Sequence, residues 1–193
     1  MGGYPDKEIF EKSVFLIEKT GFDFIEIGLP FSEPVADGPV IVKAIETALK
    51  NNTKVSYIIN FLEKLKTYKF KKYIMTYSNI VYGYGIKKFS KDFKDIVNSI
   101  IIADLPNKMH LFFYDHGFEI PIIPFVTPES RKKDIELIKE LKGDFVYFIA
   151  IRGITGGKFD FNQPELREKI ETVKKETQKK SNYGIRLEKQ QRR

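Results

Sequence analysis

The sequence predicts an α/β fold built on a parallel β-sheet. Three observations lead to this prediction. Short apolar runs alternate with segments of helical period, the runs are apolar on both faces, and turn residues such as Gly and Pro follow most of them. This alternation requires right-handed crossovers, and it fits both a doubly wound sheet and a (β/α)₈ barrel. Five strands are expected, fewer than the eight of a complete barrel, which typically needs about 250 residues.

The expected elements follow one another along the chain. The first helix covers residues 8–20, where apolar side chains recur with a helical period up to a Gly. The apolar run 22–31 is the first strand, and helix 39–51 begins with a Pro, a residue favoured in the first helical turn. The same criteria predict helix 54–66, strand 72–77, helix 86–96, strand 99–103, helix 107–116, strand 120–126, helix 131–141, strand 144–151 and helix 163–179.

The positive charge of the chain is confined to its C-terminal end. The 193 residues include 33 Lys and Arg and 26 Asp and Glu, a net charge of +7. Residues 173–193 hold eight basic and two acidic side chains, so the rest of the chain is nearly neutral. A basic tail can bind RNA or lipid, but a solvated helix end is the more common case. We therefore expect no nucleic-acid partner.

Several classes of protein are excluded by what the sequence lacks. It has no cysteine, which excludes a disulfide scaffold and a thiolate metal site and fits a cytoplasmic location. No run of about 18 apolar residues exists, so no membrane span is expected. No secretory signal is visible at the N-terminus. His110 and His116 lack the partners and spacing of a metal site, so none is predicted.

Ligands bind at the C-terminal ends of the strands in either architecture, so the polar residues there are the candidates. They are Glu26, Asp37, Tyr77, Asn79, Asp104, Thr127 and the loop 153–157. Glu26 lies between two isoleucines, where burial would raise its pKa toward the range used in acid–base catalysis. The alternative is a structural carboxylate hydrogen-bonded to backbone or to a Tyr.

Two further candidates have structural alternatives of equal or greater weight. Asp37 precedes a helix, so helix capping explains it as well as function does. Together with Glu26, however, it could divide acid and base roles. The Gly-rich loop 153–157 could offer backbone N–H groups to a phosphate, but a plain strand–helix turn is the more common interpretation.

Residues 24–44, FIEIGLPFSEPVADGPVIVKA, resemble the signature of the tryptophan synthase alpha chain family, E-[LIV]-G-[LIV]-P-[FY]-S-[DE]-P-x-A-D-G-P after an apolar strand. Other family segments are matched in order by residues 3–6, 77–79, 83–86, 103–106, 125–128 and 147–156. The resemblance implies a (β/α)₈ barrel, incomplete here, with about strands 2–6 and their helices. We expect this partial barrel domain to span residues 1–180, and residues 181–193 to be a disordered basic tail outside the family.

The resemblance also implies a function. Family members are lyases of tryptophan biosynthesis that cleave indole-3-glycerol phosphate to indole and glyceraldehyde 3-phosphate in a retro-aldol step. Glu26 matches the catalytic Glu that moves a proton between the glycerol hydroxyl and indole C3. Asp37 matches the catalytic Asp that holds the indole N–H. Substrate-binding positions are matched by Tyr77, Ile101, Ala103, Tyr147, Thr155 and Gly156.

The family has no cofactor in this chain. Pyridoxal phosphate belongs to the beta chain, with which the alpha chain forms an alpha2beta2 complex, and loops 33–38 and 153–160 would face that partner. The phosphate-binding turn of the family is not matched, which predicts poor turnover by the isolated chain. One alternative is a non-catalytic module that docks on a beta chain. Another is nucleic-acid binding through the tail. A related phosphate-binding barrel enzyme is disfavoured by the pairing of Glu26 with Asp37.

Overall fold

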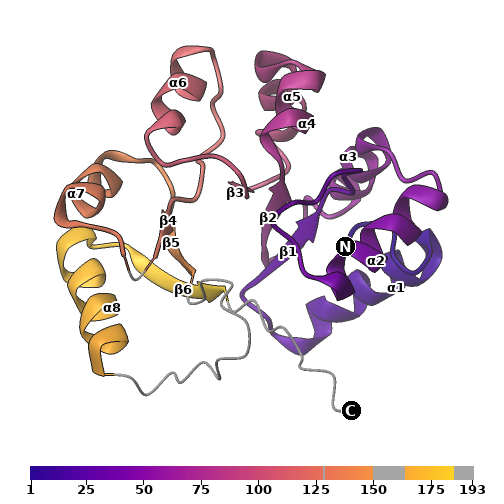
Figure 1. Cartoon of the computed structure of the whole chain (residues 1–193). Helices are drawn as coiled ribbons and strands as arrows, with labels where there is room; N and C mark the ends of the chain where they lie inside the picture. Colours follow the sequence, from indigo (N-terminus) through magenta and orange to yellow (C-terminus); the bar gives the residue numbers. More distant parts are fainter. Residues whose placement is uncertain (128, 150–163, 185–193) are drawn as a thin grey trace. The chain divides into compact units, whose positions relative to one another are not determined.

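A computed structural model describes residues 1–127, 129–149 and 164–184 of the chain. The fold is α/β, and Figure 1 traces its elements in chain order. The chain divides into two compact units. Unit 1 contains Met1–Leu105 and Leu111–Pro121, and unit 2 contains Pro106–His110 and the described residues from Ile122 on.

Unit 1 is built on three parallel strands in the order β1-β2-β3. They are β1 (Phe24–Gly28), β2 (Lys71–Thr76) and β3 (Ser99–Ile102). The helices before and between the strands are α1 (Lys7–Ile17), extended by a 3₁₀ turn (Glu18–Thr20), α2 (Pro39–Lys50), α3 (Val55–Lys64), α4 (Ser78–Tyr84) and α5 (Ile86–Phe93). Helix α6 (Met109–Asp115) follows β3.

Buried apolar side chains hold the helices of unit 1 against its sheet. Ile25 and Ile27 of β1 are buried, and so are Ile74 of β2 and Ile100 of β3. Aromatic side chains fill the rest of this core. The largest fully buried ones are Phe61, Phe89, Phe93, Phe113 and Phe118. Because burial of each such side chain contributes about 1.5–3 kcal/mol, this apolar core holds the helices against the sheet.

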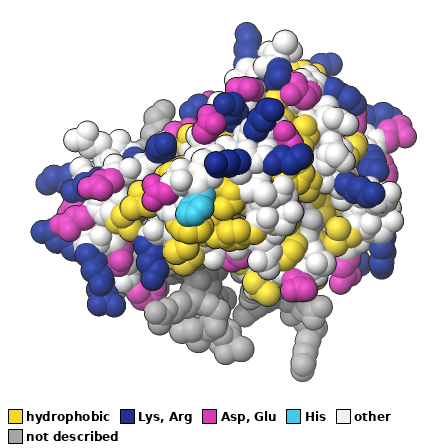
Figure 2. Space-filling model, turned by 90° about the horizontal axis from the view of Figure 1, so that it is seen from above, with side chains coloured by type: hydrophobic (Ala, Val, Ile, Leu, Met, Phe, Trp, Pro, Cys, Tyr) yellow, Lys and Arg dark blue, Asp and Glu magenta, His cyan; other side chains and the backbone are white. Residues whose placement is uncertain are grey.

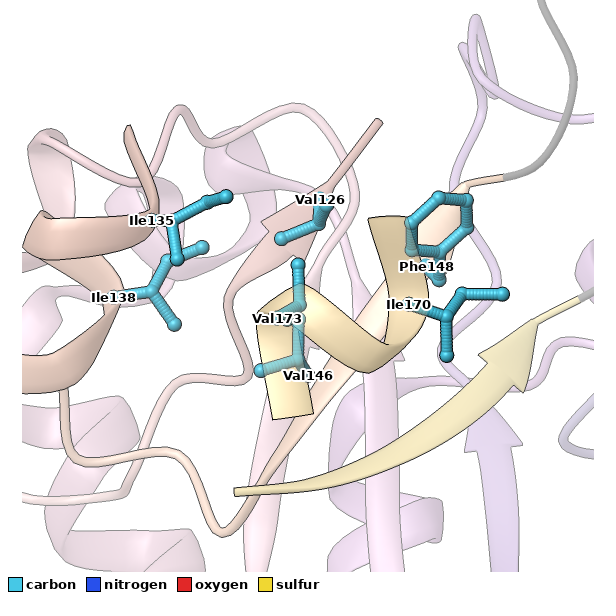
Figure 3. Close-up of a cluster of buried hydrophobic side chains, with 7 residues drawn as sticks. All are labelled: Val126, Ile135, Ile138, Val146, Phe148, Ile170 and Val173. Atoms are coloured by element: carbon cyan, nitrogen blue, oxygen red, sulfur yellow. The ribbon is translucent and has the colours of Figure 1, made fainter. Parts of the chain in front are cut away.

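Unit 2 has three parallel strands in the order β4-β5-β6. Its elements are β4 (Phe125–Val126), α7 (Lys132–Glu140), β5 (Phe145–Ile149), α8 (Pro164–Thr177) and β6 (Lys180–Gly184). Side chains from β4, β5, α7 and α8 meet in one apolar cluster (Figure 3), made of Val126, Ile135, Ile138, Val146, Phe148, Ile170 and Val173. This cluster is the core of unit 2.

Three elements differ from the expectation. Residues 180–184 form β6, which pairs with β5 along its whole length, so the described residues hold six strands where five were expected. Regular structure thus reaches into the segment expected to be a disordered tail. Within the expected strand 120–126, only residues 125–126 pair with a neighbouring strand. Helix α4 follows β2, where no helix was expected. The sequence KSNYG of β6 has no apolar run, and its backbone pairing to β5 makes it a strand.

The face of the molecule seen in Figure 2 shows no strong separation of charge. In Figure 2, basic and acidic side chains are interspersed on the visible face, and hydrophobic side chains lie between them. This mixing agrees with the nearly neutral sequence of the body. Among the described residues, no helix is long and apolar enough to cross a membrane.

The first residues of the chain lie against the end of β1. The Gly2 N–H donates to the Gly28 carbonyl at 3.0 Å, and Gly3 has a φ of +74°. A Cβ at Gly3 would collide with the Thr53 hydroxyl.

We therefore expect Gly3→Ala to lower the free energy of unfolding by about 1–2 kcal/mol, because it adds both backbone strain and a clash. Urea unfolding measures this effect. Gly83→Ala is the matched control, since a Cβ there meets no atom within 4 Å. Equal unfolding midpoints for the two variants would refute the prediction.

Candidate active site

The strand register brings several predicted site residues to one face of the unit 1 sheet. Glu26 lies opposite Tyr73, and Met75 lies opposite both Gly28 and Ile101. Because successive residues of a strand point to opposite faces, these five residues share one face, and the buried isoleucines of β1 face the other way.

Tyr77 and Ala103 continue the same face beyond the ends of β2 and β3. Tyr77 comes two residues after Met75, and Ala103 two residues after Ile101. The Ala103 N–H donates to the Thr76 carbonyl at 2.9 Å, so the pairing of the two strands continues past β3. Tyr77 and Ile101 are buried and Ala103 is partly exposed. The fold thus gathers four predicted positions, Glu26, Tyr77, Ile101 and Ala103, near the C-terminal ends of adjacent strands.

Glu26 is accessible to solvent, while its neighbours Ile25 and Ile27 are buried. The protein atoms around its carboxyl group nevertheless remove enough water to raise its pKa. The positive charge of the Met1 amino group opposes this shift, and the negative charge of Asp37 adds to it. Among the described residues no group hydrogen-bonds to the Glu26 carboxylate. Within the described residues, Glu26 therefore lacks the hydrogen bonds of the structural alternative.

Asp37 is held by a tyrosine from the neighbouring strand end. The Tyr77 hydroxyl donates to Asp37 Oδ2 at 2.6 Å and accepts the Ala36 N–H at 3.1 Å. The Tyr77 ring lies 5.0 Å from the Phe31 ring, which further fixes it. Helix α2 has Gly38 as its N-cap and receives no side-chain cap, so the capping interpretation of Asp37 is wrong. The carboxylate is instead fixed in place with one oxygen bonded to a phenol.

The other polar candidates at the strand ends have local structural roles. Asp104 accepts both the N–H and the hydroxyl of Ser78 at 2.7 Å, which anchors the start of α4. The Thr127 N–H donates to the Ser130 hydroxyl at 3.0 Å within a turn. Asn79 is exposed. These contacts leave Glu26 and Asp37 as the carboxylates of the unit 1 site.

Tyr147 belongs to unit 2 and is described by itself. It lies in β5, partly exposed, with its ring 5.4 Å from that of Phe125 and its N–H bonded to the Pro124 carbonyl at 2.9 Å. Thr155 and Gly156, together with the rest of the loop 153–157, lie outside the described residues.

In the part of the chain that the structure describes, no three His, Cys, Asp or Glu side chains cluster so that they could hold a metal ion. Sequence reasoning missed one group at the site, the Ala36 N–H that orients Tyr77. No local sequence pattern predicts it, because the fold brings Ala36 and Tyr77 together.

Comparisons with known proteins agree with the motifs. A family model described as tryptophan synthase alpha chain matches residues 1–192. The tryptophan synthase alpha chain of Thermoanaerobacter pseudethanolicus is 36% identical over 192 residues, which cover 95% of this chain and 71% of that protein. The alpha chain of Clostridium acetobutylicum is 39% identical over 158 residues, which cover 80% of this chain and 60% of that protein.

Solved structures show the same relationship. Tryptophan synthase subunit alpha from Campylobacter jejuni superimposes with a TM-score of 0.81 at 27% identity, covering 94% of this chain and 74% of that one. A protein from Aquifex aeolicus gives a TM-score of 0.82 at 30% identity, covering 94% of this chain and 71% of that one. The chain therefore spans about 60–74% of the length of these relatives.

Proposed function

The chain belongs to the tryptophan synthase alpha chain family, and we propose that Glu26 and Asp37 are its catalytic pair for the retro-aldol cleavage of indole-3-glycerol phosphate. The fold is that of the family's (β/α)₈ barrel, of which this chain supplies an incomplete part. The family acts in tryptophan biosynthesis as a lyase. The observation that carries the proposal is the different environment of the two carboxyl groups, one with a raised pKa and one fixed by a tyrosine.

The chemistry needs two such groups. Cleavage of the bond between indole C3 and the glycerol chain requires a proton on C3 and removal of the proton from the adjacent hydroxyl. The electron pair of the broken bond stays with the indole ring, and the hydroxyl carbon becomes an aldehyde. A carboxyl group with a raised pKa can give one proton and take the other, so Glu26 is suited to this role. An ionised Asp37 can accept the indole N–H and stabilise the positive charge of the C3-protonated ring.

The remaining positions would form the pocket. Tyr77, Ile101 and Ala103 share the face of Glu26 and present mostly apolar surface, which suits an indole ring. Tyr147, Thr155 and Gly156 are proposed as pocket positions on the family motif alone.

The family has no cofactor of its own in the alpha chain. We extend the proposal to a complex with a pyridoxal phosphate-dependent beta chain, of alpha2beta2 composition and in the cytoplasm. The exposed side chains of Glu33 and Val35 lie in the loop 33–38, which would face that partner.

An indole-release assay with the purified chain, alone and with a beta chain, tests the proposal. We expect slow release of indole from indole-3-glycerol phosphate, with a rate that depends on Glu26. The competing interpretation is a non-catalytic module that docks on the beta chain. Stable association with the beta chain without any release of indole would favour that module.

Tyr77→Phe probes how Asp37 is held. The variant removes a hydroxyl that bonds a carboxylate, an interaction worth about 1.5 kcal/mol, so kcat/KM should fall about tenfold. Tyr84→Phe is the matched control, because the Tyr84 hydroxyl donates to Asp92 at the same distance, 2.6 Å, away from the strand ends. If both variants lowered kcat/KM equally, the positioning role of Tyr77 would be wrong.

A further inference from the structure

Lys72 is a buried lysine that the proposed reaction does not use. The residue is 8% exposed. On β2 it lies on the same face as the side chains of Ile74 and Thr76. Its ammonium donates to the Tyr68 carbonyl at 2.9 Å and lies 5.6 Å from the centre of the Phe70 ring. Lysine is rarely buried without an ionic partner.

The ammonium of Lys72 has unused hydrogen-bonding capacity. Within the described residues, no carboxylate lies in ion-pairing range of its Nζ atom, although the charge of Glu18 acts on it. An ammonium carries three N–H donors, and the Tyr68 carbonyl uses one of them. Two donors therefore remain without an acceptor among the residues that the structure describes.

Lys72 lines a cavity of about 320 Å³ in unit 1. It is lined by Lys66, Lys72, Lys94, Asp95, Ile96, Val97 and Asn98. Lys72 is near the start of β2 and Asn98 directly precedes β3, so the cavity lies at the opposite ends of these strands from Tyr77 and Ala103. It is separate from the candidate active site.

The charge of the lining favours an anion. The lining includes three lysines and one acidic residue, Asp95. Lys66 pairs with Glu63 at 2.7 Å and Lys94 with Glu119 at 2.9 Å, but both pairs are exposed. Exposed pairs contribute little free energy, so both lysines can turn toward a ligand.

Most backbone N–H groups at this cavity are already bonded within the protein. The N–H groups of Ile96 and Val97 bond the Phe93 carbonyl, and that of Asn98 bonds the Lys72 carbonyl. The side-chain amide of Asn98, whose Oδ1 accepts the Lys72 N–H, adds a donor, but only the lysine ammonium groups bring positive charge to the cavity. A compact anion with several charged oxygens can engage all three of them at once.

We propose that this cavity binds a small phosphate-class dianion, either inorganic phosphate or a phosphate monoester. The volume is at the small end of ligand pockets, which suits such a ligand. The charge-assisted bonds to a buried ammonium would provide most of the affinity. The inference does not depend on the proposed reaction, because none of the lining residues belongs to that site.

Isothermal titration calorimetry of the full chain with inorganic phosphate, at constant ionic strength, tests the inference. We expect saturable binding that Lys72→Met weakens by at least about tenfold, the loss of one charge-assisted bond. Lys12→Met is the control, because Lys12 is an exposed lysine paired with Glu8 elsewhere in unit 1. A parallel titration with glycerol 1-phosphate decides between free phosphate and a monoester.

A second variant covers the case in which Lys72→Met does not fold. Lys94→Gln changes an exposed position and should weaken phosphate binding about threefold. Glu26→Gln should leave phosphate binding unchanged, as expected of a cavity whose lining does not include Glu26. Absence of saturable binding to the wild-type chain, or equal affinity in the wild type and the lysine variants, would overturn the inference.

Discussion

Glu26→Gln is expected to lower the rate of indole release by at least about 100-fold, the usual contribution of a general acid–base group. The glutamine keeps the size of the side chain but can neither give a proton to C3 nor take one from the hydroxyl. The loss should appear mainly in kcat, because an uncharged amide of the same shape can still line the pocket. Steady-state kinetics with indole-3-glycerol phosphate measures it.

Unfolding must be separated from loss of chemistry in this variant. The raised pKa of Glu26 means that the folded chain holds its proton more tightly than the unfolded chain does. This group therefore contributes full stability below its unfolded pKa, and the contribution is lost as the pH rises through the raised folded value. The glutamine does not ionise, so the variant does not lose this stability as the pH rises. At neutral pH, Glu26→Gln should therefore melt at the same temperature as the wild type or higher.

The control is Glu63→Gln, which changes an exposed glutamate in α3 that pairs with Lys66. It should leave indole release unchanged. Full activity in Glu26→Gln, with a normal melting temperature, would disprove the assignment of Glu26 as the proton-transfer group.

The sequence was sufficient to predict the elements that have clear apolar patterns. The run around Glu26 predicted β1, and the family motif pointed to Ile101 and Ala103, which the strand register of the structure then places on the same face as Glu26. These features depend on local pattern and on simple sheet geometry, which sequence contains. The family motif added the roles of the site residues.

Other features depend on contacts between distant residues. Strand β6 has a polar sequence and exists through its pairing with β5. Asp37 could equally cap α2 on local grounds, and the hydroxyl of Tyr77, 40 residues further along the chain, is what engages it instead. Lys72 occupies a place where a strand usually has an apolar residue, and its burial against a polar cavity cannot be read from its neighbours.

The second prediction with a large expected effect concerns His110 and the pH dependence of the free energy of unfolding. Its side chain is fully buried, and neither ring nitrogen has a hydrogen-bond partner among the residues that the structure describes. Burial lowers the pKa of His110 to about 4, and the positive charge of Lys179 adds to this effect. Lys179 is itself held by the carbonyls of Leu141 and Gly143, which keeps its charge in place.

The unfolded chain binds a proton at this histidine near pH 6.5, whereas the folded chain binds it only near pH 4. Between these values the unfolded chain holds more protons, so acid favours unfolding. The stabilisation that neutral His110 gives the folded chain is fully present above about pH 6.5 and is lost as the pH falls toward 4. The difference corresponds to roughly 3 kcal/mol at the acid end.

This dependence is measured by urea unfolding of the wild type and of His110→Leu between about pH 7 and pH 4. The quantity compared is the difference between their free energies of unfolding at each pH. Other groups, Glu26 included, titrate in the same range, and the difference between the two proteins removes their shared contribution. We expect the stability of the wild type to fall by up to about 3 kcal/mol relative to the variant across this range. His116→Gln changes an exposed histidine whose Nδ1 lies 2.8 Å from the Phe112 carbonyl, and it should follow the wild-type curve. Parallel curves for the wild type and His110→Leu would show that His110 is already protonated, or already paired, in the folded chain.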